Sequence, residues 1–278
     1  MDRYAVFGHP VRHSLSPRIH AAFAAQTGEA LSYEAIEAPL AGFADALRAF
    51  VAAGGRGGNV TVPFKEEAFR LADRCDALAQ QAQAVNTLRV EADGSLSGFN
   101  TDGIGLLRDL TQNLALELRG RRVLLLGAGG AAAGVIGPLL AAGVAELVLA
   151  NRTADRAAAL AARFAGQGPI RTAPLAAPGA AFDVVLNATA AGLGGQAPAV
   201  PAAAFGPQTL AYDLVYGPAA AAFLALARAA GARACHDGLG MLVEQAAEAF
   251  WLWRGGGPPP PPRHPPPPPP PPRNPHLV

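Results

Sequence analysis

A glycine-rich turn that joins a short apolar segment to a helix-forming one constrains the fold most. Val123 to Leu126 holds only large aliphatic residues, as expected for a central strand of a parallel sheet. It leads directly into Gly127-Ala128-Gly129-Gly130-Ala131-Ala132, which fits the pattern G-x-G-x-x-A. In that pattern the glycines allow a tight turn and a close approach to a pyrophosphate, while the alanine lets the helix pack on the strand. The turn therefore predicts a dinucleotide-binding βα unit with phosphates at the helix N-terminus.

The uncharged stretch 123–145 is also long enough to cross a bilayer. However, the stretch contains six glycines and Pro138, and after Gly127 its large aliphatic residues give way to Gly and Ala. These features favour a buried strand, a turn and a buried helix instead. We expect Pro138 to kink that helix.

The residues after the next predicted strand indicate which nucleotide is bound. In NAD enzymes an Asp or Glu about twenty residues after the glycine turn binds the ribose hydroxyls. This chain has Asn151-Arg152-Thr153 there, with Arg156 one turn later. Two guanidinium groups and a hydroxyl suit a 2′-phosphate, so NADP is the predicted cofactor. In the structural alternative, Thr153 only caps the next helix and Arg156 is solvated.

Strand-like and helix-like segments alternate along the chain, which is typical of an α/β protein. Strands are expected at 3–8, 31–38, 59–62, 84–91, 95–100, 123–126, 147–150, 183–186, 210–215 and 233–235. Helices are expected at 17–27, 40–53, 64–73, 102–116, after the glycine turn, and at 154–164, 218–230 and 241–253. The last helix is expected to return to the first domain. Residues 1–102 and 239–254 would then form an N-terminal α/β substrate domain, and 103–238 a Rossmann-type NADP-binding domain.

The chain contains a single lysine, Lys65, among 22 Lys and Arg residues. Arginine keeps its proton at any workable pH, whereas an ammonium can give up its proton and act as a base. An isolated lysine in this background indicates either a proton-transfer role or the chance survival of one surface lysine. Composition does not decide between these two interpretations.

Hydroxyl and amide side chains cluster at the ends of predicted elements in the first hundred residues. They lie in Ser14-Leu15-Ser16-Pro17, Asn59-Val60-Thr61-Val62-Pro63-Phe64-Lys65, Asn86-Thr87 and Asn100-Thr101-Asp102. Such groups suit a small polyhydroxylated ligand with one anionic group. Each also has a structural interpretation, because Ser16 and Asp102 are candidate helix caps and Asn59 could serve a turn.

Taken together, these stretches resemble the shikimate dehydrogenase family. The matching segments run in order from about residue 4 to residue 254. They are Tyr4-Ala5-Val6-Phe7-Gly8, His13 to Pro17, Asn59 to Lys65, Ala84 to Thr87, Gly98 to Gly103, the glycine turn, Asn151 to Thr153, Asp213 to Tyr216 and Asp237 to Gln245.

The resemblance implies reversible NADPH-dependent reduction of 3-dehydroshikimate to shikimate, a step in aromatic amino-acid biosynthesis. It implies that Lys65 and Asp102 form the catalytic pair and that no metal takes part. The substrate contacts it implies are Ser14, Ser16, Asn59, Thr61, Lys65, Asn86, Asp102, Tyr216 and Gln245. The expected cofactor contacts are Gly127, Ala128, Gly129, Gly130, Ala131, Asn151, Arg152, Thr153, Arg156, Thr189, Leu214 and Gly238.

Two regions depart from the family pattern. Asn187-Ala188-Thr189-Ala190-Ala191-Gly192 has alanines where the family often has serines, which weakens the expectation of cofactor contacts from that loop. A Pro-rich stretch at 255–278 replaces the helix with which the family normally ends, and we expect it to be disordered or polyproline II. Its composition is also what a shifted reading frame in GC-rich DNA would give.

Three alternatives remain at this stage. One is a related dehydrogenase that acts on quinate or uses NAD, another a scaffold whose proline tail docks on aromatic grooves, and the third a nucleotide sensor without catalysis. A net charge of +1 argues against nucleic-acid or membrane partners. Two cysteines, Cys75 and Cys235, and an N-terminus without a long apolar core favour a cytoplasmic protein. A homodimer is the expected assembly.

Overall fold

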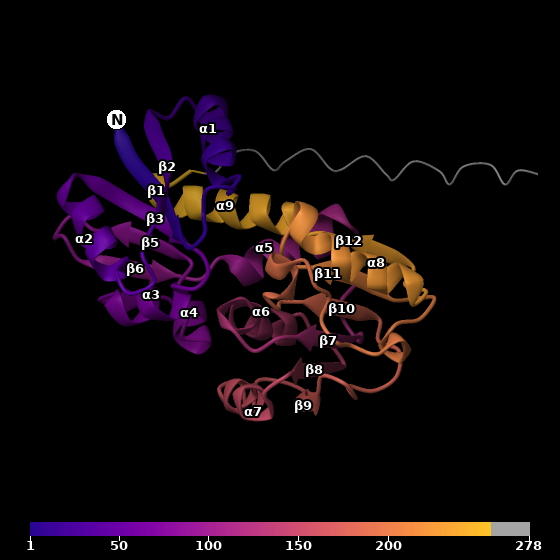
Figure 1. Cartoon of the computed structure of the whole chain (residues 1–278). Helices are drawn as coiled ribbons and strands as arrows, with labels where there is room; N and C mark the ends of the chain where they lie inside the picture. Colours follow the sequence, from indigo (N-terminus) through magenta and orange to yellow (C-terminus); the bar gives the residue numbers. More distant parts are fainter. Residues whose placement is uncertain (257–278) are drawn as a thin grey trace, which may run out of the picture.

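The structure is a computed structural model and describes residues 1–256. Two six-stranded sheets with their helices occupy the two halves of the molecule, and α9 (Leu239–Arg254) runs from one half to the other (Figure 1). The Pro-rich stretch expected at 255–278 falls almost wholly outside the described residues.

The first sheet is mixed. Its order is β2 (Leu31–Glu37), β1 (Asp2–Gly8), β3 (Gly55–Val60), β5 (Thr87–Val90), β6 (Leu96–Phe99) and β4 (Arg74–Cys75). β1 pairs in parallel with β2 and β3, whereas β5 is antiparallel to both β3 and β6. The expected hairpin at 84–100 is thus confirmed.

The second sheet is parallel throughout. Its order is β12 (Ala234–His236), β11 (Leu210–Asp213), β10 (Val184–Asn187), β7 (Arg122–Leu126), β8 (Glu146–Asn151) and β9 (Ile170–Pro174). The strand order reverses direction at β7 and β10, and in such sheets ligands bind outside the carboxyl ends of the strands at that point. The side chains of β7 between Val123 and Leu126 are completely buried, as the apolar pattern predicts.

The remaining helices cover these sheets. They are α1 (Ser16–Thr27), α2 (Phe43–Ala52), α3 (Lys65–Leu71), α4 (Ala77–Ala82), α5 (Asp102–Arg108), α6 (Gly130–Ala141), α7 (Ala154–Ala162) and α8 (Ala221–Ala229). Stretch 123–145 is therefore a strand, a turn and a helix, as the sequence favours. Within residues 1–256 no helix is both long and apolar enough to span a membrane.

Several elements differ from the expectations. The strand expected at 59–62 lies earlier, at Gly55–Val60, because the glycine-rich residues 55–58 give no apolar signal although their backbone pairs with β1. The helix expected over 102–116 is α-helical only to Arg108 and continues as a π-helical turn at Asp109–Asn113. The sequence missed β4, α4 and β9. Two of these are very short, and β9 is an edge strand whose exposed residues give no apolar alternation.

Helices α5 and α6 approach each other closely at Gly103 and Pro138. A Cβ atom on Gly103 would lie 2.3 Å from the Pro138 ring and 2.6 Å from the carbonyl oxygen of Gly134. Proline has no N–H to bond the carbonyl four residues earlier, so the carbonyl of Gly134 has no such partner within α6. Pro138 lies inside α6, and its ring is the surface against which α5 packs.

Helix α9 returns to the first sheet, which confirms the expected path of the chain. It packs against α5 and α1 and reaches β5. At its end Trp253 Nε1 donates a hydrogen bond to the carbonyl of Leu88 at 3.0 Å, and the Trp253 ring stacks on Tyr4 with centroids 4.5 Å apart. Arg254 forms ion pairs with Asp2 and Glu29.

Phe250 provides a test of this docking. Its side chain is completely buried and packs edge-on against Phe23, whereas the neighbouring Trp251 is 50% exposed. We expect Phe250→Ala to lower the free energy of unfolding by about 3–5 kcal/mol, because it leaves a cavity in the core. The matched control Trp251→Ala should cost less than about 1 kcal/mol. Urea denaturation measures both values, and equal losses would contradict this docking.

Candidate active site

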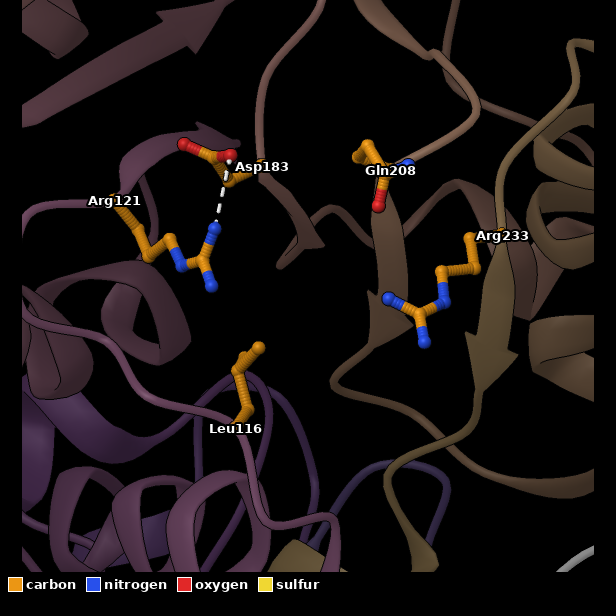
Figure 2. A pocket seen from close by; sticks show the side chains of 5 residues that line it. All are labelled: Leu116, Arg121, Asp183, Gln208 and Arg233. Atoms are coloured by element: carbon orange, nitrogen blue, oxygen red, sulfur yellow. Dashed lines mark ion pairs between the residues drawn. The ribbon is translucent and has the colours of Figure 1, made fainter.

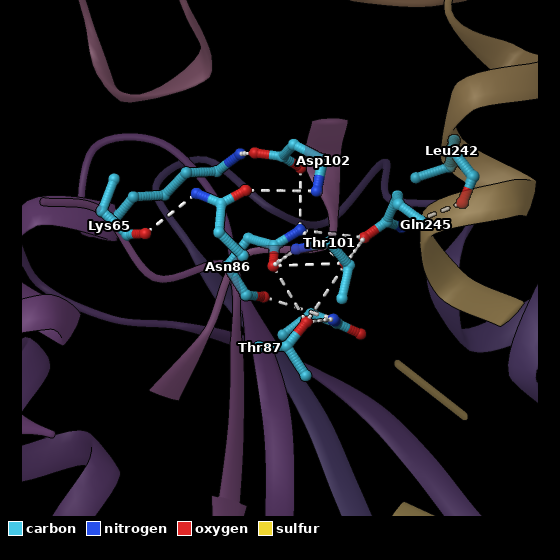
Figure 3. Close-up of polar contacts among 10 residues, drawn as sticks. Lys65, Asn86, Thr87, Thr101, Asp102, Leu242 and Gln245 are labelled. Carbon is cyan, nitrogen blue, oxygen red and sulfur yellow. Dashed lines mark hydrogen bonds and ion pairs between the residues drawn. The ribbon is translucent and has the colours of Figure 1, made fainter. Parts of the chain in front are cut away.

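Lys65 and Asp102 form a buried ion pair at the starts of two helices. Lys65 is the first residue of α3 and Asp102 the first residue of α5. Lys65 Nζ lies 2.5 Å from Asp102 Oδ2, and the two side chains are only 12% and 7% exposed (Figure 3). A lysine held against a carboxylate in this way can give a proton to, or accept one from, an oxygen brought beside it.

The β5–β6 hairpin brings the amide-rich segments to this pair. Thr87 lies opposite Phe99 in the hairpin, so Asn86 and the segment that follows β6 lie at the same end of the sheet. Asn86 Nδ2 donates to Asp102 Oδ1 at 2.8 Å and lies 3.2 Å from Gln245 Oε1, which α9 supplies (Figure 3). Lys65 and Asn86 thus meet at the Asp102 carboxylate, and Gln245 lies against Asn86.

The 14–16 segment, which holds two of the expected substrate residues, contacts the second half of the molecule. Ser14 Oγ accepts a hydrogen bond from the backbone N–H of Ser16 at 3.2 Å. The hydroxyl of Tyr216, from the second half of the molecule, accepts one from the N–H of Leu15 at 3.3 Å. Thr61 follows β3, and its N–H donates to Phe7 O at 2.9 Å.

The helix-cap alternatives for Ser16 and Asp102 are wrong, because Leu15 and Thr101 occupy the cap positions of α1 and α5. Thr153 does occupy the N-cap position of α7, but its side chain makes no capping hydrogen bond. Ser16 and Asp102 lie inside the first turn, where a side chain cannot take the cap position, and both carboxylate oxygens of Asp102 are already bonded to Lys65 and Asn86.

The glycine turn points the N-terminus of α6 at Lys65. Gly127 has a φ of +106°, which a residue with a side chain rarely adopts. The first helical hydrogen bond of α6 runs from Ala133 N to Gly129 O, so the preceding amides have no intrahelical partner. A Cβ atom on Gly129 would meet nothing within 4 Å, and one on Gly130 would lie 3.3 Å from Lys65 Cβ. The expected phosphate cradle and the Lys65–Asp102 pair are therefore neighbours.

The segment after β8 offers two free guanidinium groups. Asn151 Nδ2 donates to Thr153 O at 2.9 Å, which shapes the turn. Arg152 and Arg156 are exposed, and neither belongs to any ion pair among residues 1–256. The open amides of α6 and these two cations fit the diphosphate and the additional phosphate of NADP.

A buried pair that the sequence analysis missed joins the loops after β10 and β11. Asn187 Nδ2 donates to Asp213 Oδ2 at 2.8 Å, and these residues face each other in the register of the two strands. Asn187 Oδ1 accepts from the N–H of Thr189 at 3.1 Å, and Asp213 Oδ1 from that of Val215 at 3.0 Å. A polar residue at the carboxyl end of each of two neighbouring parallel strands was the signal that could have revealed the pair.

The other two cofactor residues expected here lie at the same edge. Leu214 N donates to Asn187 O at 2.9 Å, and Gly238 N donates to Val215 O at 2.9 Å. The carboxyl ends of β10, β11 and β12 thus carry Thr189, Leu214 and Gly238 side by side.

A separate hollow lies at the opposite, amino edge of the second sheet. Leu116, Arg121, Asp183, Gln208 and Arg233 line it, and Arg121 NH1 lies 3.5 Å from Asp183 Oδ1 (Figure 2). Since it is on the far side of the sheet from the glycine turn, it does not belong to the site around Lys65.

A dinucleotide loop that faces a lysine–carboxylate pair defines the class of nicotinamide-dependent dehydrogenases with two α/β halves. Family models match the chain in three places. The shikimate dehydrogenase substrate-binding domain matches residues 6–88, shikimate/quinate 5-dehydrogenase residues 109–193, and the shikimate 5′-dehydrogenase C-terminal domain residues 238–262. The chain belongs to the shikimate dehydrogenase family.

Individual proteins agree with this assignment. A shikimate dehydrogenase (NADP⁺) from Dechloromonas aromatica is 56% identical over 91% of this chain and 93% of the relative. One from Aromatoleum aromaticum is 57% identical over 92% of both. The crystal structure of shikimate 5-dehydrogenase from Thermus thermophilus in complex with NADP(H) and shikimate has a TM-score of 0.81 and 40% identity, and covers 94% of this chain and 96% of that one. The expected two-part fold, with a substrate-binding half and a Rossmann-type NADP-binding half, is confirmed.

Asp213 gives the site a measurable pH signature. Burial raises its pKa from 3.8 to about 6, so the folded protein holds this proton more tightly than the unfolded chain does. Lowering the pH from 7 to 5 should therefore stabilise the wild type relative to Asp213→Asn, by about 1 kcal/mol. Urea denaturation of both proteins at the two pH values measures the difference, and identical pH dependence would refute it.

Proposed function

We propose that the protein catalyses the reversible NADPH-dependent reduction of 3-dehydroshikimate to shikimate. The observation that carries the proposal is the contact between Lys65 Nζ and Asp102 Oδ2 directly in front of the α6 N-terminus. Membership of the family and relatives named as NADP⁺-dependent shikimate dehydrogenases support it.

The protein's own task in this reaction is to manage one proton. NADPH, when bound, supplies the hydride that the carbonyl carbon gains. Lys65 donates a proton to the carbonyl oxygen in the direction of shikimate and accepts it back in reverse. Asp102 holds the lysine in place, and Asn86 holds Asp102 through its other oxygen. Each turnover toward shikimate ends when Lys65 regains a proton from solvent.

The remaining polar groups hold the substrate and the cofactor in this proposal. The carboxylate and hydroxyls of the substrate contact Ser14, Ser16, Asn59, Thr61, Asn86, Tyr216 and Gln245. The cofactor lies along Gly127 to Ala131, Asn151 to Thr153, Arg156, Thr189, Leu214 and Gly238. Support comes from the position of these groups on both sides of the Lys65–Asp102 pair.

The proposed domain division assigns 1–102 and 239–254 to the substrate and 103–238 to NADP. All six strands of the second sheet fall within 122–236, and α9 packs on elements of the first half. We also propose a cytoplasmic enzyme, in keeping with its two free cysteines, and a homodimer, whose mass light scattering would measure.

Lys65→Ala tests the proton-transfer role. We expect turnover with shikimate and NADP⁺ to fall by at least about a thousandfold, because the group that takes the proton from the substrate is removed. NADPH binding, followed by fluorescence, should persist, since the cofactor contacts are elsewhere. Lys65→Arg keeps the charge but removes an accessible proton acceptor, so it should be equally inactive. Near-normal turnover in either variant would contradict the assignment.

Arg152→Ala tests the choice of nucleotide. Loss of one charge-assisted contact to the 2′-phosphate should weaken NADPH binding by about tenfold or more, while NADH binding stays the same. Arg228→Ala, which removes an exposed arginine from α8, is the control and should change neither affinity. Equal weakening of both nucleotides would place Arg152 away from the 2′-phosphate.

A further inference from the structure

Tyr33 lies outside every motif that identifies the family, yet its hydroxyl reaches the site. Tyr33 is on β2, and its hydroxyl donates a hydrogen bond to Asn59 Oδ1 at 2.7 Å. Burial raises the pKa of Tyr33 well above its ordinary value of 10, so the phenol keeps its proton. Toward the Asn59 oxygen, Tyr33 is therefore a permanent donor.

Tyr33 completes the hydrogen bonding of the Asn59 amide. Asn59 is 5% exposed, and its Nδ2 donates to Thr87 Oγ1 at 3.0 Å and lies 3.2 Å from Asn86 O. A reversed amide would set its oxygen against the Asn86 carbonyl, which can only accept, so that carbonyl selects the amide orientation. Tyr33 then supplies the donor that the buried Asn59 oxygen needs. Both ends of Asn59 are thereby bonded to protein groups.

The constraint then passes to the Lys65–Asp102 pair. Thr87 Oγ1 accepts from Asn59 and donates to Asn86 Oδ1 at 3.0 Å. Together with the Thr101 N–H, which donates to the same oxygen at 2.8 Å, this bond turns Asn86 Nδ2 toward Asp102 Oδ1, at 2.8 Å. Figure 3 shows the last links, from Thr87 through Asn86 and Asp102 to Lys65. We call the sequence Tyr33, Asn59, Thr87, Asn86, Asp102 and Lys65 the positioning path.

Aromatic neighbours hold the ring of Tyr33. His20 stacks on it with centroids 4.2 Å apart and planes 9° apart, and Trp253 lies at 6.2 Å. His20 is completely buried, and burial lowers its pKa to about 3 against the opposing effect of the Asn59 side chain. The neutral imidazole serves here as a flat surface, and it lies one turn after Ser16 on α1.

We propose that Tyr33 is a positioning residue for proton transfer, which acts on Lys65 through the positioning path and does not touch the substrate. The inference rests on the proposed function for its catalytic consequence. Without the Tyr33 hydroxyl, the buried Asn59 oxygen loses its donor, and Asn59 and Thr87 are held less firmly. Asn86 then depends on the Thr101 N–H to hold its oxygen, and its contact with Asp102 loosens. Lys65 is then no longer held at one position.

Tyr33→Phe removes the hydroxyl and keeps the ring. The matched control is Tyr4→Phe, because Tyr4 pairs with Tyr33 in the register of β1 and β2 and also packs on Trp253, yet lies outside the path. We expect kcat with shikimate to fall about tenfold in Tyr33→Phe, equivalent to roughly 1.4 kcal/mol, and to stay within twofold in Tyr4→Phe. NADPH affinity should be unchanged in both. A normal kcat in Tyr33→Phe, or an equal loss in Tyr4→Phe, overturns the proposal.

A double variant tests whether Tyr33 acts through Asn59. In an Asn59→Ala background, Tyr33→Phe should cause no further loss of kcat, because the path is already broken. Losses that multiply would overturn the inference. Should Tyr33→Phe fail to fold, Thr87→Val breaks the path at a residue that is not a proposed substrate contact, and it carries the same expectations for kcat and NADPH binding.

The single lysine allows a test without substrate. Reductive methylation of Lys65, read by peptide mass spectrometry, should be severalfold faster in Tyr33→Phe than in the wild type or Tyr4→Phe, because the ammonium is less firmly held by Asp102. Equal labelling rates would overturn the positioning role. If the wild type fails to oxidise shikimate while the labelling difference holds, the proposed function fails and the positioning role stands.

Discussion

The buried contact between Lys65 and Asp102 is the interaction around which the rest of the molecule is arranged. A charge pair that is about nine-tenths buried is stable only if its remaining polar atoms are bonded, and Asn86 meets that need for Asp102. The pair lies where the first half meets α6 of the second. Lys65 opens α3 and Asp102 opens α5, while α6 presents its first turn to Lys65. The close packing of Gly103 on Pro138 holds α5 and α6 at the distance that this contact requires.

Local patterns predicted much of the fold and of the site. The strand, the glycine turn and the helix at 122–141 are where the sequence places them, because the signal is contained within one continuous segment. Lys65 was singled out by composition, and its partner by resemblance. Asn187, Asp213 and Tyr33 were missed because their roles depend on the register between strands that are distant in sequence. The cap interpretations failed for a similar reason, since a cap depends on the backbone angle at one residue, which a sequence pattern does not give.

The buried imidazole of His20 lowers the stability of the fold, and it also holds the ring of Tyr33 in place. A polar ring inside a core costs free energy compared with an apolar ring of the same shape. Here it lies between α1, β2 and α9, next to Tyr33, Phe23, Phe250 and Trp253. Asp213 follows the same logic in the other half, where a carboxylate is kept in a buried place that raises its pKa. Both groups lie beside segments that the proposed reaction needs in fixed positions.

The return of α9 to the first sheet has a consequence for how the protein is made. On the ribosome, the strands of the second sheet emerge as one uninterrupted segment and can associate as soon as they are complete. The first sheet emerges earlier but lacks the surface that Phe250 and Trp253 provide until residue 254 has been synthesised. The half that is synthesised first is therefore the half that finishes folding last, and Gln245 joins Asn86 only at that final step.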